Sequence, residues 1–184
     1  MESIQRRHAI GFVTPLRYPG GKRKLFAFFR DLIETNGLTG AHYIEPFAGG
    51  AGLALSLLIS GYVNTIHLND LDRAIYTFWK VVLEETEELC KRISDTAVTM
   101  EVWRQQRRVL ATPEKHSALD VAFATLFLNR TNRSGILWGG VIGGLEQRGK
   151  WKLDARFNKT DLIERIERIA TFKKRIRLYL SLIH

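Results

Sequence analysis

The feature that most constrains the fold is a glycine-rich turn between two short apolar segments. Residues 41–45 predict a strand, residues 46–52 a turn and residues 53–59 a helix, because three glycines interrupt an otherwise apolar run. Residues 65–68 predict a second strand, which ends directly before Asn69-Asp70. The order strand, glycine turn, helix, strand and acid is typical of the start of a doubly wound α/β sheet.

The remainder of the chain is predicted to be mostly helical. Apolar side chains recur at helical spacing in five further segments, which cover residues 25–33, 75–83, 86–110, 119–129 and 162–172. Residues 130–152 carry six glycines and predict a loop or hairpin. Residues 176–183 predict a third strand. A mostly helical insert of about residues 85–160 is therefore expected to interrupt the α/β sheet.

Basic side chains are concentrated in the second half of the chain. Residues 1–90 hold 9 basic and 10 acidic side chains, whereas residues 91–184 hold 19 basic and 9 acidic ones. This asymmetry predicts a polyanion-binding half joined to a nearly neutral half. A solubilising surface is the alternative interpretation, and charge alone does not separate the two.

Composition excludes several other classes of protein. The single cysteine, Cys90, can form neither an internal disulfide nor a zinc cluster. No apolar run reaches the roughly 18 residues that span a bilayer, and residues 1–7 lack the apolar core of a secretion signal. We therefore expect a cytoplasmic protein without structural metal or membrane contact.

The glycine turn and Asp70 together predict a site for a nucleoside-containing cofactor. A turn without side chains lets a ligand approach the backbone and aims the next helix N-terminus at it. Asp70 lies 18 residues after Gly52, where a carboxylate can accept from ribose hydroxyls. The turn departs from the G-x-G-x-x-G fingerprint of nicotinamide enzymes, so a methyl donor is favoured over a dehydrogenase cofactor. A purely structural turn is the remaining alternative.

Three motifs resemble the opening motifs of the Dam-type adenine-specific DNA methyltransferases, in the order of that family. They are Pro15-Leu16-Arg17-Tyr18-Pro19-Gly20-Gly21-Lys22, Glu45-Pro46-Phe47-Ala48-Gly49-Gly50-Ala51-Gly52 and Asn69-Asp70-Leu71-Asp72. The resemblance implies an incomplete Rossmann-like methyltransferase sheet, S-adenosylmethionine as the donor and an adenine of double-stranded DNA as the acceptor. It implies these cofactor-binding residues: Tyr18, Lys22, Glu45, Pro46, Phe47, Gly49, Gly50, Gly52 and Asp70. Asp72 is expected to cap the helix that follows.

One motif of the resembled family is absent. That family holds the target amine with an Asp-Pro-Pro-Tyr-like tetrapeptide, whereas the four prolines of this chain are all separated. No catalytic residue is therefore predicted. The expected place of the motif lies just beyond the strand at residues 176–183, so we expect either a fragment or a second chain that completes the sheet. We also expect self-association of this chain alone, and a catalytically inactive DNA-binding or regulatory relic is the alternative function.

The insert is the expected DNA-recognition segment, because the resembled family reads its target between the early strands and the catalytic motif. Arginine and asparagine side chains can pair with guanine and adenine in the major groove. The candidate DNA-binding residues are Arg130, Asn132, Arg133, Arg148 and Lys150. Three parts are therefore predicted: a cofactor-binding part at residues 1–84, the recognition insert at residues 85–160, and a helix and strand at residues 161–184 that return to the sheet.

Overall fold

A three-stranded parallel sheet organises the chain. The computed structural model describes residues 13–181 and contains β1 (His42–Glu45), β2 (Thr65–Asn69) and β3 (Ile176–Tyr179) in the order β1-β2-β3. His42 lies opposite Thr65, and Ile66 lies opposite Ile176. The prediction of an α/β chain with these three strands is confirmed. The third strand ends four residues earlier than expected, and residues 182–183 of that prediction lie outside the described residues.

The rest of the described chain holds seven α-helices, several short 3-10 turns and the loops between them. The helices are α1 (Phe26–Thr35), α2 (Gly52–Ile59), α3 (Arg73–Glu84), α4 (Thr86–Asp95), α5 (Met100–Ala111), α6 (Ala118–Thr131) and α7 (Lys159–Ala170). The 3-10 turns are η1 (Lys22–Leu25), η2 (Pro113–Lys115), η3 (Arg133–Gly135), η4 (Leu153–Arg156) and η5 (Lys173–Arg175). No helix in residues 13–181 is both long and apolar enough to cross a bilayer.

The segment predicted to be helical at residues 86–110 consists of two separate helices, α4 and α5. Thr96 ends α4, and its hydroxyl donates back to the carbonyl of Arg92 at 2.7 Å. Thr99 begins α5, and its hydroxyl accepts from the backbone N–H of Val102 at 3.2 Å. Both threonines have an extended backbone, which places a bend where the apolar spacing alone continues.

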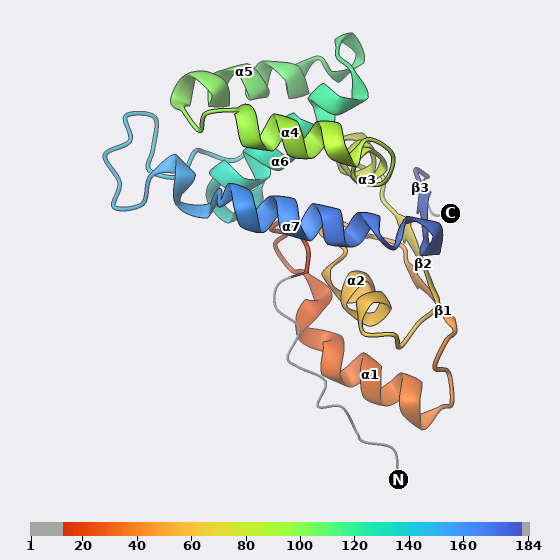
Figure 1. The fold of residues 1–184 in the computed structure, drawn as a ribbon. Helices are drawn as coiled ribbons and strands as arrows, with labels where there is room; N and C mark the ends of the chain where they lie inside the picture. Colours follow the sequence, from red (N-terminus) through yellow and green to blue (C-terminus); the bar gives the residue numbers. More distant parts are fainter. Residues whose placement is uncertain (1–12, 182–184) are drawn as a thin grey trace.

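All seven helices lie on one side of the sheet (Figure 1). That side presents Ile66, Leu68 and Ile176, which are buried. The other face presents His42, Ile44 and Tyr179, and Ile44 is 64% exposed. Because side chains alternate along a strand, one face of the sheet is packed and the opposite face is open within residues 13–181.

Helix α6 forms the centre of the helical layer, where it packs against α3 and α5. It begins with a capping box, in which Ser117 and Asp120 exchange side chain-to-backbone hydrogen bonds. Almost every later residue of α6 is buried, so the helix has no solvated face and its polar side chains need partners inside the protein. One cluster of buried side chains runs through the sheet and all helical parts. The predicted boundaries of the recognition insert, at residues 84 and 160, are therefore not breaks in the buried core, and they stay a prediction about function.

Candidate cofactor site and nucleic-acid interface

A buried carboxylate closes the end of β1. Glu45 is 2% exposed, and its Oε2 accepts from the N–H of Ala54 in the first turn of α2 at 3.2 Å. Its Oε1 lies 3.0 Å from Nζ of Lys22. Burial raises the pKa of Glu45, and the Lys22 ammonium and the Ala54 N–H oppose that rise. Lys22 also donates to the carbonyl oxygen of Phe47 at 2.7 Å, so it ties η1 to the start of the glycine turn.

Asp70 lies directly against the glycine turn. Its Oδ2 accepts from the N–H of Gly49 at 2.7 Å, and its Oδ1 accepts from the N–H of Asp72 at 2.9 Å. The indole N–H of Trp79 donates to the carbonyl of Gly49 at 2.9 Å, which holds the other side of the same residue. A carboxylate has about four acceptor positions, so each Asp70 oxygen keeps capacity for a further donor.

Tyr18 covers the turn from the N-terminal side. Gly49 has φ +47°, and a Cβ built on it would lie 2.8 Å from Cε1 of Tyr18. A Cβ on Gly50 would lie 3.2 Å from Cβ of Tyr18. Tyr18 is 47% exposed, and the pKa of its phenol is raised by partial burial and by the carboxylates of Asp70 and Asp72. Glycine at position 49 is therefore required both by its backbone conformation and by this ring contact.

A basic cleft of about 1760 Å³ opens beside the turn. Glu45, Phe47, Gly50 and Gly52 lie on one wall, whereas Pro46, Gly49 and Asp70 are outside its lining. Its basic lining residues are Arg17, Lys22, Arg23, Lys24, Arg30, Arg130, Arg156, Arg165 and Arg168. Glu45 is the one acid among the described lining residues, so the cleft carries a strong positive charge.

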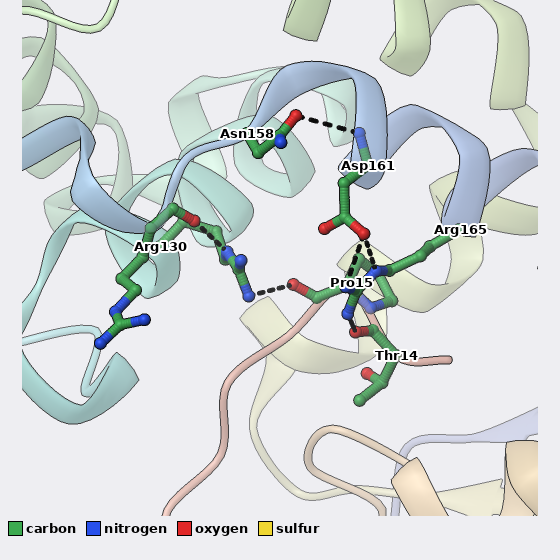
Figure 2. A network of polar contacts seen from close by, with 7 residues as sticks. Thr14, Pro15, Arg130, Asn158, Asp161 and Arg165 are labelled. Carbon is green, nitrogen blue, oxygen red and sulfur yellow. Dashed lines mark hydrogen bonds and ion pairs between the residues drawn. The ribbon is translucent and has the colours of Figure 1, made fainter. Parts of the chain in front are cut away.

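Two arginines fasten the N-terminal loop to the helical layer (Figure 2). Arg165 binds Asp161 through Nε and Nη2, at 2.9 and 2.6 Å, and donates through Nη1 to the carbonyl of Thr14 at 3.0 Å. Arg130 donates to the carbonyl of Arg156 at 2.7 Å and reaches that of Pro15 at 3.4 Å. Burial, more than the neighbouring arginines, lowers the pKa of Arg130 to about 10. Arg130 is thus partly buried and holds backbone in place.

The other candidate DNA-binding residues divide into one buried and three exposed side chains. Asn132 is 0% exposed, accepts from Nε1 of Trp103 at 2.7 Å, and donates to the carbonyls of Ile136 and Leu137. It therefore shapes the loop from inside and does not face solvent, which corrects the expectation of a direct base contact. The exposed ones are Arg133, Arg148 and Lys150.

Arg148 and Lys150 lie in the segment between η3 and η4, which forms the loop that projects from the helical layer away from the sheet (Figure 1), whereas Arg133 begins η3. Arg148 pairs with Glu146 at 2.8 Å, yet its side chain stays 86% exposed. The ammonium of Lys150 lies 5.8 Å from the ring centre of Trp151. The guanidinium of Arg107 lies against two indoles, those of Trp103 and Trp138, which attaches α5 to the base of this loop.

Asn129 is a site residue that was not among the candidate cofactor-binding or DNA-binding residues. It is 1% exposed, and its amide contacts the backbone of Arg17 and of Gly135. Its signal in the sequence is a polar side chain at the end of the apolar run from Val121 to Leu128. Such a residue in a buried helix must find partners, although the sequence does not say which.

A three-stranded parallel sheet has a glycine turn after its first strand and an acid at the tip of the next strand bonded to that turn, an arrangement consistent with a partial Rossmann-like α/β fold. The family model described as D12 class N6 adenine-specific DNA methyltransferase matches residues 18–179. The chain belongs to this family, as the sequence motifs predicted. A search of curated proteins finds no match to the chain.

Proposed function

We propose that this chain binds S-adenosylmethionine at the glycine turn and serves the methylation of the adenine amino group in double-stranded DNA. The observation that carries the proposal is the direct contact of Asp70 with Gly49, within a family of adenine-specific DNA methyltransferases. When bound, the cofactor supplies an electrophilic sulfonium methyl group. The residues of the chain bind and orient this donor.

The polar groups of the site fit such a cofactor. Asp70 keeps acceptor positions for two ribose hydroxyls, since each of its oxygens receives one backbone N–H. Lys22 uses two of the three donors of its ammonium, on Glu45 and on the Phe47 carbonyl, so one donor remains for the carboxylate of the methionine end. Phe47 is 71% exposed and offers an apolar surface next to these groups.

We propose direct transfer of the methyl group to the amine, with no bond between enzyme and base. A covalent route would need an accessible thiolate. Cys90 lies in α4, is 8% exposed, and burial raises its pKa to about 11, with a smaller contribution from Glu167. A buried neutral thiol is a poor nucleophile at pH 7, which supports the direct route.

DNA is proposed to contact the projecting loop and the rim of the basic cleft. Arg133, Arg148 and Lys150 are exposed and suited to phosphate or base contacts, whereas Arg130 and Asn132 act through the backbone that they hold. Such binding is electrostatic in large part, so affinity for duplex DNA is expected to fall steeply with salt. A salt-independent affinity would contradict the assignment of DNA as the substrate.

The group that aligns the adenine amine is proposed to come from outside these 184 residues, because no two prolines are adjacent here. The open face of the sheet supports a second chain or a further segment that covers it, since Ile44 and Tyr179 lie on it exposed. The separated prolines equally favour a second candidate function, a protein that binds cofactor and DNA without catalysing transfer.

Methyl incorporation separates the two candidates. Duplex DNA and donor with a labelled methyl group are incubated with the purified chain, with extract of its native cell, and with both. Incorporation that needs both components supports a methyltransferase completed by another polypeptide. Binding of both ligands without incorporation under any condition supports the inactive binding protein.

A further inference from the structure

The side chain of Asn129 joins two loops that are far apart in the sequence. Its Oδ1 accepts from the backbone N–H of Arg17 at 2.7 Å, and its Nδ2 donates to the carbonyl of the same residue at 2.7 Å. Nδ2 also donates to the carbonyl of Gly135 at 2.8 Å. Three of the four hydrogen-bonding positions of one buried amide are therefore spent on loop backbone.

The two loops also touch each other without any side chain between them. A Cβ built on Gly135 would lie 2.2 Å from the carbonyl oxygen of Arg17 and 2.9 Å from its Cβ. Gly135 has φ +76°, and Ser134 before it has φ +57°. Because the packing leaves no space at this contact, a displacement of one loop has to move the other.

Each loop carries one of the proposed binding functions. Arg17 directly precedes Tyr18, whose ring lies on Gly49 of the cofactor turn. Gly135 follows Arg133, an exposed candidate for DNA contact, and Ser134 lines the basic cleft. Asn129 itself is 1% exposed and touches neither ligand surface. It is placed to act only through the two loops.

We propose that Asn129 is a positioning residue that couples occupancy of the cofactor site to DNA binding by the loop at residues 132–144. A ligand that orders Tyr18 and Arg17 also orders Gly135, so the second ligand meets a loop that is already arranged. Coupling between two binding sites is reciprocal, so DNA increases cofactor affinity by the same factor. The proposal rests on the proposed function, because it needs both ligands to bind.

The test measures DNA affinity with and without the cofactor product. Fluorescence anisotropy of a labelled mixed-sequence duplex is recorded in the absence and presence of saturating S-adenosylhomocysteine, for the wild type, Asn129→Ala and Thr131→Val. Thr131 is the matched control, since it is 0% exposed in the same helix and its hydroxyl bonds only the carbonyl of Phe127. In the wild type we expect the product to tighten DNA binding about tenfold, within the usual range of coupling.

The ratio of DNA affinities with and without S-adenosylhomocysteine is expected to fall to about one in Asn129→Ala, while each ligand alone still binds. Thr131→Val is expected to keep the wild-type ratio. A wild-type ratio of one, or an unchanged ratio in Asn129→Ala, overturns the coupling. If the wild type binds neither ligand, the proposed function fails instead, which is a distinguishable result. If Asn129→Ala does not fold, the same measurement is made on Gly135→Ala, because the added Cβ forces the same two loops apart. A wild-type affinity ratio in Gly135→Ala overturns the proposal.

Discussion

The contact between Gly49 and Tyr18 can be tested by adding a single methyl group. In Gly49→Ala the new Cβ would lie 2.8–2.9 Å from three ring atoms of Tyr18, on a backbone with φ +47°. Gly37 provides the matched control, because it has φ +64° and nothing lies within 4 Å of a Cβ built there. The two substitutions impose a similar backbone conformation, and one of them adds the ring contact.

The left-handed backbone costs an alanine about 1–2 kcal/mol, and this cost applies to both variants. Displacing a packed ring adds about 1–3 kcal/mol in Gly49→Ala alone. We therefore expect Gly37→Ala to lower Tm by about 2–8 °C and Gly49→Ala by about 4–20 °C for a chain of this size. The affinity for S-adenosylhomocysteine is expected to fall at least about tenfold in Gly49→Ala, a loss of about 1.4 kcal/mol in binding free energy, and to stay unchanged in Gly37→Ala.

Thermal unfolding measures the Tm of the two variants, and isothermal titration measures their affinity for S-adenosylhomocysteine. The double variant Gly49→Ala/Tyr18→Ala supplies the internal check, since removal of the ring should restore part of the stability that Gly49→Ala loses. Equal stability losses in Gly49→Ala and Gly37→Ala, or a double variant no more stable than Gly49→Ala, would refute the reasoning that Tyr18 packs on the turn.

Three further predictions concern the charges and the loop. Burial raises the pKa of Glu45 in the folded chain above its usual value near 4.5. The folded chain therefore keeps this proton to a higher pH than the unfolded chain does, and stability falls as pH rises from the unfolded pKa to the folded pKa. Lys22→Met should raise the pKa of Glu45 further and extend the fall in stability to higher pH. Relative to the wild type, the free energy of unfolding should change little at pH 4 and fall by about 1–2 kcal/mol at pH 8. This loss is smaller than for a fully buried ion pair, because Lys22 is 37% exposed. Asn132→Ala should cost about 1–3 kcal/mol in urea unfolding, because Nε1 of Trp103 loses its acceptor, and a loss no larger than that of an exposed control would contradict its structural role. Arg148→Ala should leave unfolding unchanged but reduce the slope of log affinity for DNA against log salt by about one, and an unchanged slope would remove Arg148 from the interface.

The elements that could be predicted from the sequence are those governed by local patterns. The strand that ends at Glu45, the glycine turn and the strand that ends at Asn69 follow from apolar runs broken by glycine and acid. The cap at Asp72 is likewise local, and its Oδ1 accepts from the N–H of Ala74 at 2.8 Å as expected. The position of Asp70 at the turn follows because parallel strands end at one edge of the sheet.

The partners of several polar side chains depend on tertiary contacts. Arg130 and Asn132 stand in a polar run that reads as exposed loop, yet Arg130 contacts carbonyls of two distant segments and Asn132 accepts from Trp103 in α5. Asn129 gives no local sign that its partners are Arg17 and Gly135. The break between α4 and α5 was missed because apolar spacing continues across Thr96 and Thr99, whose hydroxyls bond the backbone instead.

The most direct measurement is the titration of S-adenosylhomocysteine into the wild type, Asp70→Asn and Asp72→Asn. The two variants each remove one negative charge at nearly the same place, and asparagine caps a helix as well as aspartate, so Asp72→Asn should bind like the wild type. Asp70→Asn should bind about ten- to a hundredfold more weakly, because an ionised acceptor of ribose hydroxyls is lost. Wild-type affinity in Asp70→Asn, or an equal loss in both variants, would contradict the placement of the donor's ribose at Asp70.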